Sequence, residues 1–228
     1  MSQHWRLISV ALIATVLMTG CMTIGLYETA RTAPPGKFQG GGTLTPLHIN
    51  VTDDGVAGGF YPAAELFAKI GLGPNFDIGA RWAFGPGMAL NAKAQFLKGP
   101  LDGAIYLSGS FYGLVEDNKG FGMYSLSPRL ILSSETRSGF PFAINGGIRY
   151  IGKIGGGGTL AAVAGAGLPF RLRGTRSVRI IPELSISLPV FSSSTFKHGG
   201  TRIYRYSGVE GFYESFGISC GYVGPDRR

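Results

Sequence analysis

The sequence FDIGARWAF, at residues 76–84, decides the fold class of this chain. Its apolar side chains occupy every second position: Phe76, Ile78, Ala80, Trp82 and Phe84. The positions between them carry Asp77, Gly79, Arg81 and Ala83. Successive side chains of a β-strand point to opposite faces, so this period of two predicts a strand with one apolar and one polar face.

The same period continues on both sides of this stretch. Residues 63–72 precede it across Gly73-Pro74-Asn75, and residues 88–97 follow it across Gly85-Pro86-Gly87. Gly, Pro and Asn in these positions are typical of tight turns. Further strands are predicted at residues 37–47, 102–115, 121–133, 140–151, 159–172, 178–188 and 212–223. Ten strands in sequence predict an all-β fold, a closed antiparallel up-and-down transmembrane β-barrel, with eight to twelve strands possible.

The lengths of these strands and of their connections favour a membrane barrel. Several strands exceed the soluble mean of about 5–6 residues and approach the roughly 9–11 tilted residues that cross a bilayer. If the first strand runs outward, the two longest breaks, residues 48–61 and 191–207, both fall on the outer side. Short periplasmic turns with longer external loops are typical of outer-membrane barrels. No apolar stretch after residue 20 is long enough for a transmembrane helix.

The polar faces of the strands are predicted to form the interior. Alternation alone leaves a soluble lipocalin-like barrel open, because such a barrel has the opposite orientation of its faces. However, only 15% of residues are charged, and the polar faces are rich in Gly, Ala and Ser, which suit a narrow lumen. We therefore predict a network of luminal charges in which basic residues outnumber acidic ones. Its members are Glu65, Lys69, Asp77, Arg81, Lys93, Arg129, Arg149, Arg171, Arg179 and Glu183.

The N-terminal sequence QHWRLISVALIATVLMTGC, at residues 3–21, has the pattern of an export signal. Its ending, Met18-Thr19-Gly20-Cys21, resembles the bacterial lipobox. The resemblance implies that residues 1–20 are removed, that Cys21 carries lipid, and, because residue 22 is Met and not Asp, that the protein goes to the outer membrane. Residues 21–35 are then expected to be a lipidated periplasmic tether, residues 36–223 the barrel and residues 224–228 a C-terminal tail. By pattern, residues 36–223 resemble the small bacterial outer-membrane β-barrels.

No catalytic motif is present in the sequence. It contains no Gly-x-Ser-x-Gly elbow, no His-Glu-x-x-His and no Walker loop, so we expect no enzymatic activity, cofactor or metal. The net charge of +8 is not gathered into a Lys/Arg run, so no nucleic-acid partner is expected. The expected role is structural or surface-exposed, in a monomer surrounded by outer-membrane lipid. Two alternatives stay open: a protease or acyl-modifying enzyme with a site at the outer rim, and a soluble lipid-binding lipoprotein.

Overall fold

The computed structural model describes most of the chain from residue 26 onward. The described residues are 26, 28–51, 59–83, 87–116, 119–135, 140–154, 157–171, 178–192, 195–198, 201–205 and 211–222. Cys21, the predicted export signal and the predicted C-terminal tail lie outside them.

Long antiparallel strands form the structure. In chain order they are β1 (Phe38–Val51), β2 (Gly59–Gly73), β3 (Phe76–Ala83), β4 (Gly87–Leu97), β5 (Asp102–Glu116), β6 (Lys119–Ser134), β7 (Phe142–Lys153), β8 (Gly158–Gly167), β9 (Phe170–Arg171), β10 (Val178–Ser192), β11 (Thr195–His198), β12 (Thr201–Arg205) and β13 (Gly211–Tyr222).

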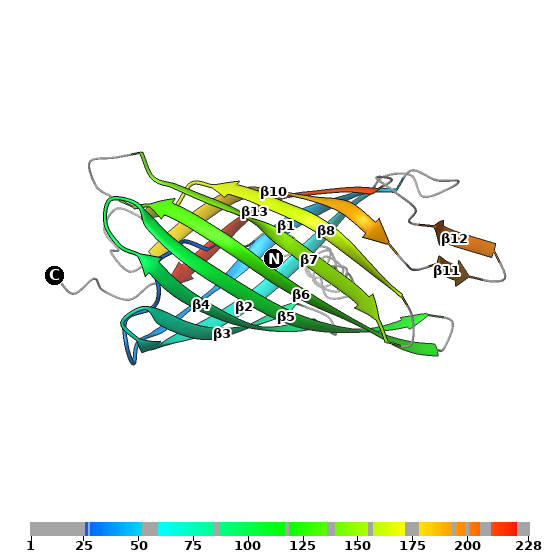
Figure 1. Ribbon diagram of the computed structural model, residues 1–228, viewed down its shortest axis with the longest axis horizontal. Helices are drawn as coiled ribbons and strands as arrows, with labels where there is room; N and C mark the ends of the chain where they lie inside the picture. The colour runs from blue at the N-terminus through cyan, green and yellow to red at the C-terminus, as the bar shows by residue number, and fades with distance from the viewer. Residues whose placement is uncertain are drawn as a thin grey trace, which may run out of the picture.

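The strand pairing closes the sheet into a barrel (Figure 1). Each strand from β1 to β8 pairs with the next, β10 pairs with β8, and β13 pairs with both β10 and β1. Tyr222 lies opposite Gly40 on one side and Val178 on the other, so no edge is left between the first and last strands. Within the described residues, ten strands form the ring, which confirms the predicted closed antiparallel up-and-down barrel.

The two ends of the barrel differ. At one end, which we call the turn end, β1 starts and short connections join β2 to β3 and β4 to β5. At the opposite end, which we call the loop end, lie the connection from β1 to β2 and the longest connection between barrel strands, from β10 to β13. The latter includes the β11–β12 hairpin, which lies beyond the barrel wall (Figure 1). The long β10–β13 connection agrees with the break predicted at residues 191–207. The break predicted at residues 48–61 is reduced to residues 52–58 and is shorter than the connection from β8 to β10 at the turn end, so that part of the prediction is wrong.

Several strands are longer than their side-chain pattern predicted. β1 continues to Val51 and β2 begins at Gly59, because the backbone ladder between them extends to the pair of Ile49 with Gly59. Backbone hydrogen bonds of a ladder do not require alternating side chains, so the pattern ended before the strand did. The strand predicted at residues 159–172 is instead divided into β8 and β9.

The orientation of the faces is apolar outside and polar inside. On β4, for example, Leu90 is 62% exposed whereas Lys93 is 1% exposed. Large apolar side chains are exposed around the ring, among them Leu44, Leu66, Trp82, Leu90, Ile105, Leu126, Ile148 and Leu184. A soluble ligand-binding barrel has the reverse arrangement, so the described residues do not provide the apolar interior that the lipocalin-like alternative requires.

Candidate functional site

The interior of the barrel holds a piece of its own chain. Leu26 and residues 28–35, which we call the luminal segment, precede β1 and contact side chains from six different strands. Leu26, Glu28, Thr29, Ala30 and Ala33 are all buried. This differs from the sequence interpretation, which assigned residues 21–35 to a periplasmic tether. Polar character suits a solvated tether, but it equally suits a segment enclosed by a charged lumen.

Glu28 is the central acidic group of the luminal segment. Its Oε2 lies 2.6 Å from Nζ of Lys69 on β2 and 3.0 Å from Nζ of Lys93 on β4. Lys93 Nζ also donates hydrogen bonds to the backbone carbonyls of Thr29 and Arg31, and lies 3.5 Å from Asp77 Oδ2. All four charged side chains in contact here are buried, so each depends on the others for compensation of its charge.

Further contacts hold the segment on other sides of the ring. Arg31 Nε lies 2.6 Å from Asp102 Oδ2, at the start of β5. The backbone N–H of Ala30 donates to Ser133 Oγ on β6, and that of Ala33 donates to Asp77 Oδ2 on β3. The segment therefore satisfies buried backbone groups through wall side chains, as buried peptide groups require.

Arg179 joins the segment to β10. Its Nη1 donates to Thr29 Oγ1, and its Nη2 lies 2.9 Å from Glu135 Oε2. β10 lies across the ring from β3 and β4, so the luminal segment is bonded to both sides of the barrel wall.

Leu26 is held deeper in the barrel by two charged residues. Its N–H donates to Glu183 Oε1 at 2.8 Å, and its carbonyl accepts a hydrogen bond from Arg81 Nη2. Arg81 Nη1 also lies 3.6 Å from Glu65 Oε2. Glu183 accepts further hydrogen bonds from Ser185 Oγ and Asn145 Nδ2.

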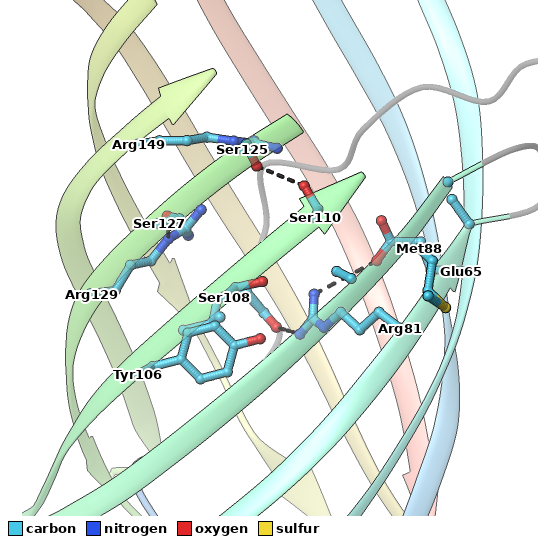
Figure 2. Close-up of a pocket in the computed structure, with 14 residues that line it drawn as sticks. Glu65, Arg81, Met88, Tyr106, Ser108, Ser110, Ser125, Ser127, Arg129 and Arg149 are labelled. Carbon is cyan, nitrogen blue, oxygen red and sulfur yellow. Dashed lines mark hydrogen bonds and ion pairs between the residues drawn. The ribbon is translucent and has the colours of Figure 1, made fainter. Parts of the chain in front are cut away.

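Beyond Leu26 the lumen contains a polar cavity of about 40 Å³ (Figure 2). Its lining includes Glu65 and the side chains of three arginines, Arg81, Arg129 and Arg149. Four serines complete its polar wall: Ser108, Ser110, Ser125 and Ser127. The cavity extends from Leu26 to Ala83 and Gly87, where β3 ends and β4 begins at the loop end.

Eight of the ten predicted luminal residues fall into two groups. Lys69, Asp77, Lys93 and Arg179 contact the luminal segment near the turn end, whereas Glu65, Arg81, Arg129 and Arg149 line the cavity. Glu183 lies between the two groups, at Leu26. Arg171 lies in β9 and pairs with Arg179 of β10, and the structure does not describe the Arg171 side chain.

Sequence reasoning missed the residues that the luminal segment contributes. Glu28, Thr29 and Arg31 precede the first strand and have no period-two pattern, so they were not assigned to the interior. One signal was available: the predicted lumen had more basic than acidic residues, and Glu28 is an acidic residue next to the barrel sequence.

The described interior is arranged for ion pairing and hydrogen bonding. In the part of the chain that the structure covers, no three His, Cys, Asp or Glu side chains are grouped so that they could hold a metal ion. The buried charged groups contact one another, backbone groups and neutral side chains such as Ser185 and Asn145, which makes this part of the interior a polar core.

Comparisons with known proteins give fold-level matches only. No family model matches the chain, and no curated protein matches it. Among solved structures it is similar to Neisserial surface protein A, with 9% identity, a TM-score of 0.40 and coverage of 82% of this chain and 97% of that chain. The translocator domain of the autotransporter NalP from Neisseria meningitidis matches with 10% identity, a TM-score of 0.41, and 96% and 95% coverage.

A third similar structure is the outer membrane protease OmpT from Escherichia coli. It has 13% identity and a TM-score of 0.39, and the match covers 87% of this chain and 100% of that chain. At these identities and TM-scores the matches say nothing about what this chain does.

Proposed function

We propose that this protein is an outer-membrane β-barrel of structural or surface-exposed role, without catalytic activity, whose interior is closed by its own N-terminal segment. The observation that carries the proposal is the inversion of its two faces: large apolar side chains are exposed around the wall, while Lys69, Lys93, Asp77 and Glu183 are buried. Such a wall is stable only where its exterior meets lipid, because that amount of exposed apolar surface is unfavourable in water.

The strand architecture supports the same environment. A closed ring satisfies every backbone N–H and C=O of the wall between neighbouring strands, as a bilayer demands. Barrel strands of eight to sixteen residues are compatible with crossing the hydrocarbon layer at a tilt. None of the described residues forms a helix of the length and apolar character that a membrane-spanning helix needs.

The luminal segment argues against an open channel. Small barrels are filled by side chains, and here backbone groups of Leu26, Ala30 and Ala33 add to that filling. The ion pairs of Glu28 with Lys69 and Lys93 hold this segment inside the barrel. We therefore propose that the intact protein conducts no steady ion current.

The lipid anchor at Cys21 is part of this proposal and comes from the sequence. Only residues 22–25 separate Cys21 from Leu26, which is buried in the lumen. Five residue steps span at most roughly 17 Å in extended form. An acyl group on Cys21 would therefore be tied closely to the barrel itself.

Alkaline carbonate extraction of cell envelopes tests membrane insertion independently of the anchor. The variant Cys21→Ala, with a working signal-peptidase site, is expected to stay in the membrane pellet because the barrel wall itself contacts lipid. A matched lipoprotein without a barrel, also lacking its lipidated cysteine, should be released. Release of the Cys21→Ala variant as a folded soluble protein would refute the proposal. Metabolic labelling with a palmitate analogue tests lipidation: the wild-type protein should incorporate the label, and the Cys21→Ala variant should not.

A bilayer recording tests closure of the lumen. The full mature chain is expected to show no steady conductance, whereas deletion of residues 26–34 is expected to produce one. A steady current through the intact protein would contradict a closed interior.

A further inference from the structure

The two ends of the barrel differ in charge. The connections at the turn end, together with the residues that flank β1 and β13 there, contain eight basic and two acidic residues. The basic residues are Lys37, Lys98, Arg137, Arg171, Arg173, Arg176, Arg227 and Arg228. The connections at the loop end, where the β11–β12 hairpin lies (Figure 1), contain three basic and four acidic residues. The turn end is therefore strongly positive, whereas the loop end is close to neutral.

Acidic side chains near the turn end face the interior of the barrel. Asp77, Asp102 and Glu135 form the ion pairs with luminal basic groups described above, and each side chain is at most 4% exposed. Lys37 and Lys98 are instead exposed. In the described part of the turn end, negative charge is thus directed inward and positive charge lies at the surface.

Exposed aromatic side chains lie next to these basic residues. The rings that are 46–73% exposed at the turn end are Phe38, Phe96, Phe140 and Phe170. In the sequence they are one to three residues from Lys37, Lys98, Arg137 and Arg171, respectively. One strand residue rises about 3.3 Å, so each basic residue is at most about 10 Å along the chain from an exposed ring. Aromatic rings are enriched where lipid chains meet headgroups, and the headgroup layer is roughly 5–7 Å thick. The basic residues therefore lie at the level of the headgroups.

We infer that the turn end is a docking surface for the phosphate headgroups of anionic phospholipids in the surrounding leaflet. Lysine and arginine side chains place their apolar stems along apolar surface and extend their charge toward the headgroups. A guanidinium group also binds phosphate through paired hydrogen bonds. The exposed rings beside the basic residues favour a lipid partner over a soluble polyanion, because they hold the same residues at the membrane surface. This selectivity rests on the insertion of the barrel into lipid that is proposed above.

Electron spin resonance with spin-labelled lipids measures the preference of the barrel surface for one headgroup over another. The folded mature protein is reconstituted in phosphatidylcholine vesicles that contain a trace of spin-labelled phosphatidylglycerol or of spin-labelled phosphatidylcholine. Lipid in contact with the barrel gives a motionally restricted spectrum, and its fraction gives the relative association constant. The wild-type protein is expected to prefer phosphatidylglycerol by at least about threefold, because each basic residue near the surface adds to the attraction. Equal association of the two lipids overturns the inference.

Two variants with the same loss of charge locate the preference on the molecule. The turn-end variant carries three replacements in three different connections: Lys98→Gln, Arg137→Gln and Arg173→Gln. The loop-end variant, which is the matched control, carries three replacements in the β11–β12 hairpin: Lys197→Gln, Arg202→Gln and Arg205→Gln. The turn-end variant is expected to lose about half of the preference or more, and the loop-end variant to keep it. An equal loss in both variants overturns the inference, because the effect would then reflect net charge alone.

Added salt gives a second measurement, which uses the wild-type protein and does not depend on the folding of a variant. In about 1 M NaCl the Debye length is about 3 Å, so the two lipids should associate almost equally. A preference that salt leaves unchanged would contradict attraction by charge. Flotation of the same vesicles in a density gradient measures insertion separately. Protein that floats with neutral vesicles but shows no preference overturns only the docking surface, whereas protein that leaves the vesicles contradicts the membrane proposal as well.

Discussion

Replacement of Glu28 by Gln removes the acidic group that faces two buried lysines. The amide has nearly the same shape as the carboxylate, so packing against the lumen is preserved while the charge is lost. Lys69 and Lys93, now 2.6 and 3.0 Å from a neutral group, would keep their desolvation cost without its main compensation. We expect the luminal segment to leave the lumen more often, while the barrel wall keeps its strand pairing.

The size of the effect follows from the geometry. At an effective dielectric constant of about 20, each of the two contacts corresponds to an attraction of about 6 kcal/mol, which desolvation of the ions largely offsets. Removal of one partner from a buried ion pair costs about 3–5 kcal/mol. Asp77 still faces Lys93 at 3.5 Å, which favours the lower end of this range. A loss of about 3 kcal/mol corresponds to about a 100-fold larger open population.

Thiol labelling measures this population directly. Thr29 is fully buried in the segment, so a charged maleimide reaches the thiol of Thr29→Cys only when the segment opens. The substitution replaces the hydroxyl that accepts a hydrogen bond from Arg179, so every protein compared carries it. The measurement uses a Cys21→Ala, Cys220→Ala background folded in detergent. Glu28→Gln is expected to accelerate labelling by about 100-fold, with far-UV circular dichroism unchanged.

A double variant separates loss of the ion pairs from a general disturbance of the lumen. Glu28→Gln combined with Lys69→Gln removes one anion and one cation and leaves Lys93 paired with Asp77, so most of the slow labelling should return. Labelling by the single variant within twofold of the parent would refute the idea that these pairs hold the segment. Labelling of the double variant as fast as that of the single variant would also refute it.

Three further changes test other parts of the structure. Gly71→Ala would bring a methyl group against backbone carbonyls of the luminal segment, so it should accelerate the same labelling reaction, whereas Gly73→Ala, with open space around the added carbon, should not. Leu126→Arg places a charge at the centre of β6 on the exposed face, so it should lower the free energy of unfolding in lipid vesicles by about 2–4 kcal/mol. Urea titration measures this change, and an unchanged value would contradict contact with lipid. Asp102→Asn removes the charged partner of Arg31, whose side chain is 35% exposed, so the free energy of unfolding should fall by less than about 1 kcal/mol. A larger fall in the same titration would show that solvent does not screen this ion pair.

Most of the barrel wall follows from local sequence. Period-two alternation in stretches such as residues 76–84 and 88–97 determines which residues share a face, and tight-turn residues determine where those strands end. Because both signals are local, they also determined the number of strands and the end at which the longest connection, from β10 to β13, lies. They could not determine the full length of β1 and β2, because the ends of these strands, at the pair of Ile49 with Gly59, are formed by backbone pairing between the two strands.

Only the tertiary structure decided what fills the barrel. Alternation along β2 and β4 predicts that charged side chains such as Lys69 and Lys93 face the interior. Their partner, Glu28, lies far from them along the chain and outside any strand. Likewise, Arg129 and Arg149 meet Ser110 in one cavity only because β5, β6 and β7 are neighbours in the closed ring. The physical reason is that alternation is a property of one strand, whereas compensation of a buried charge depends on every group brought within a few ångströms of it.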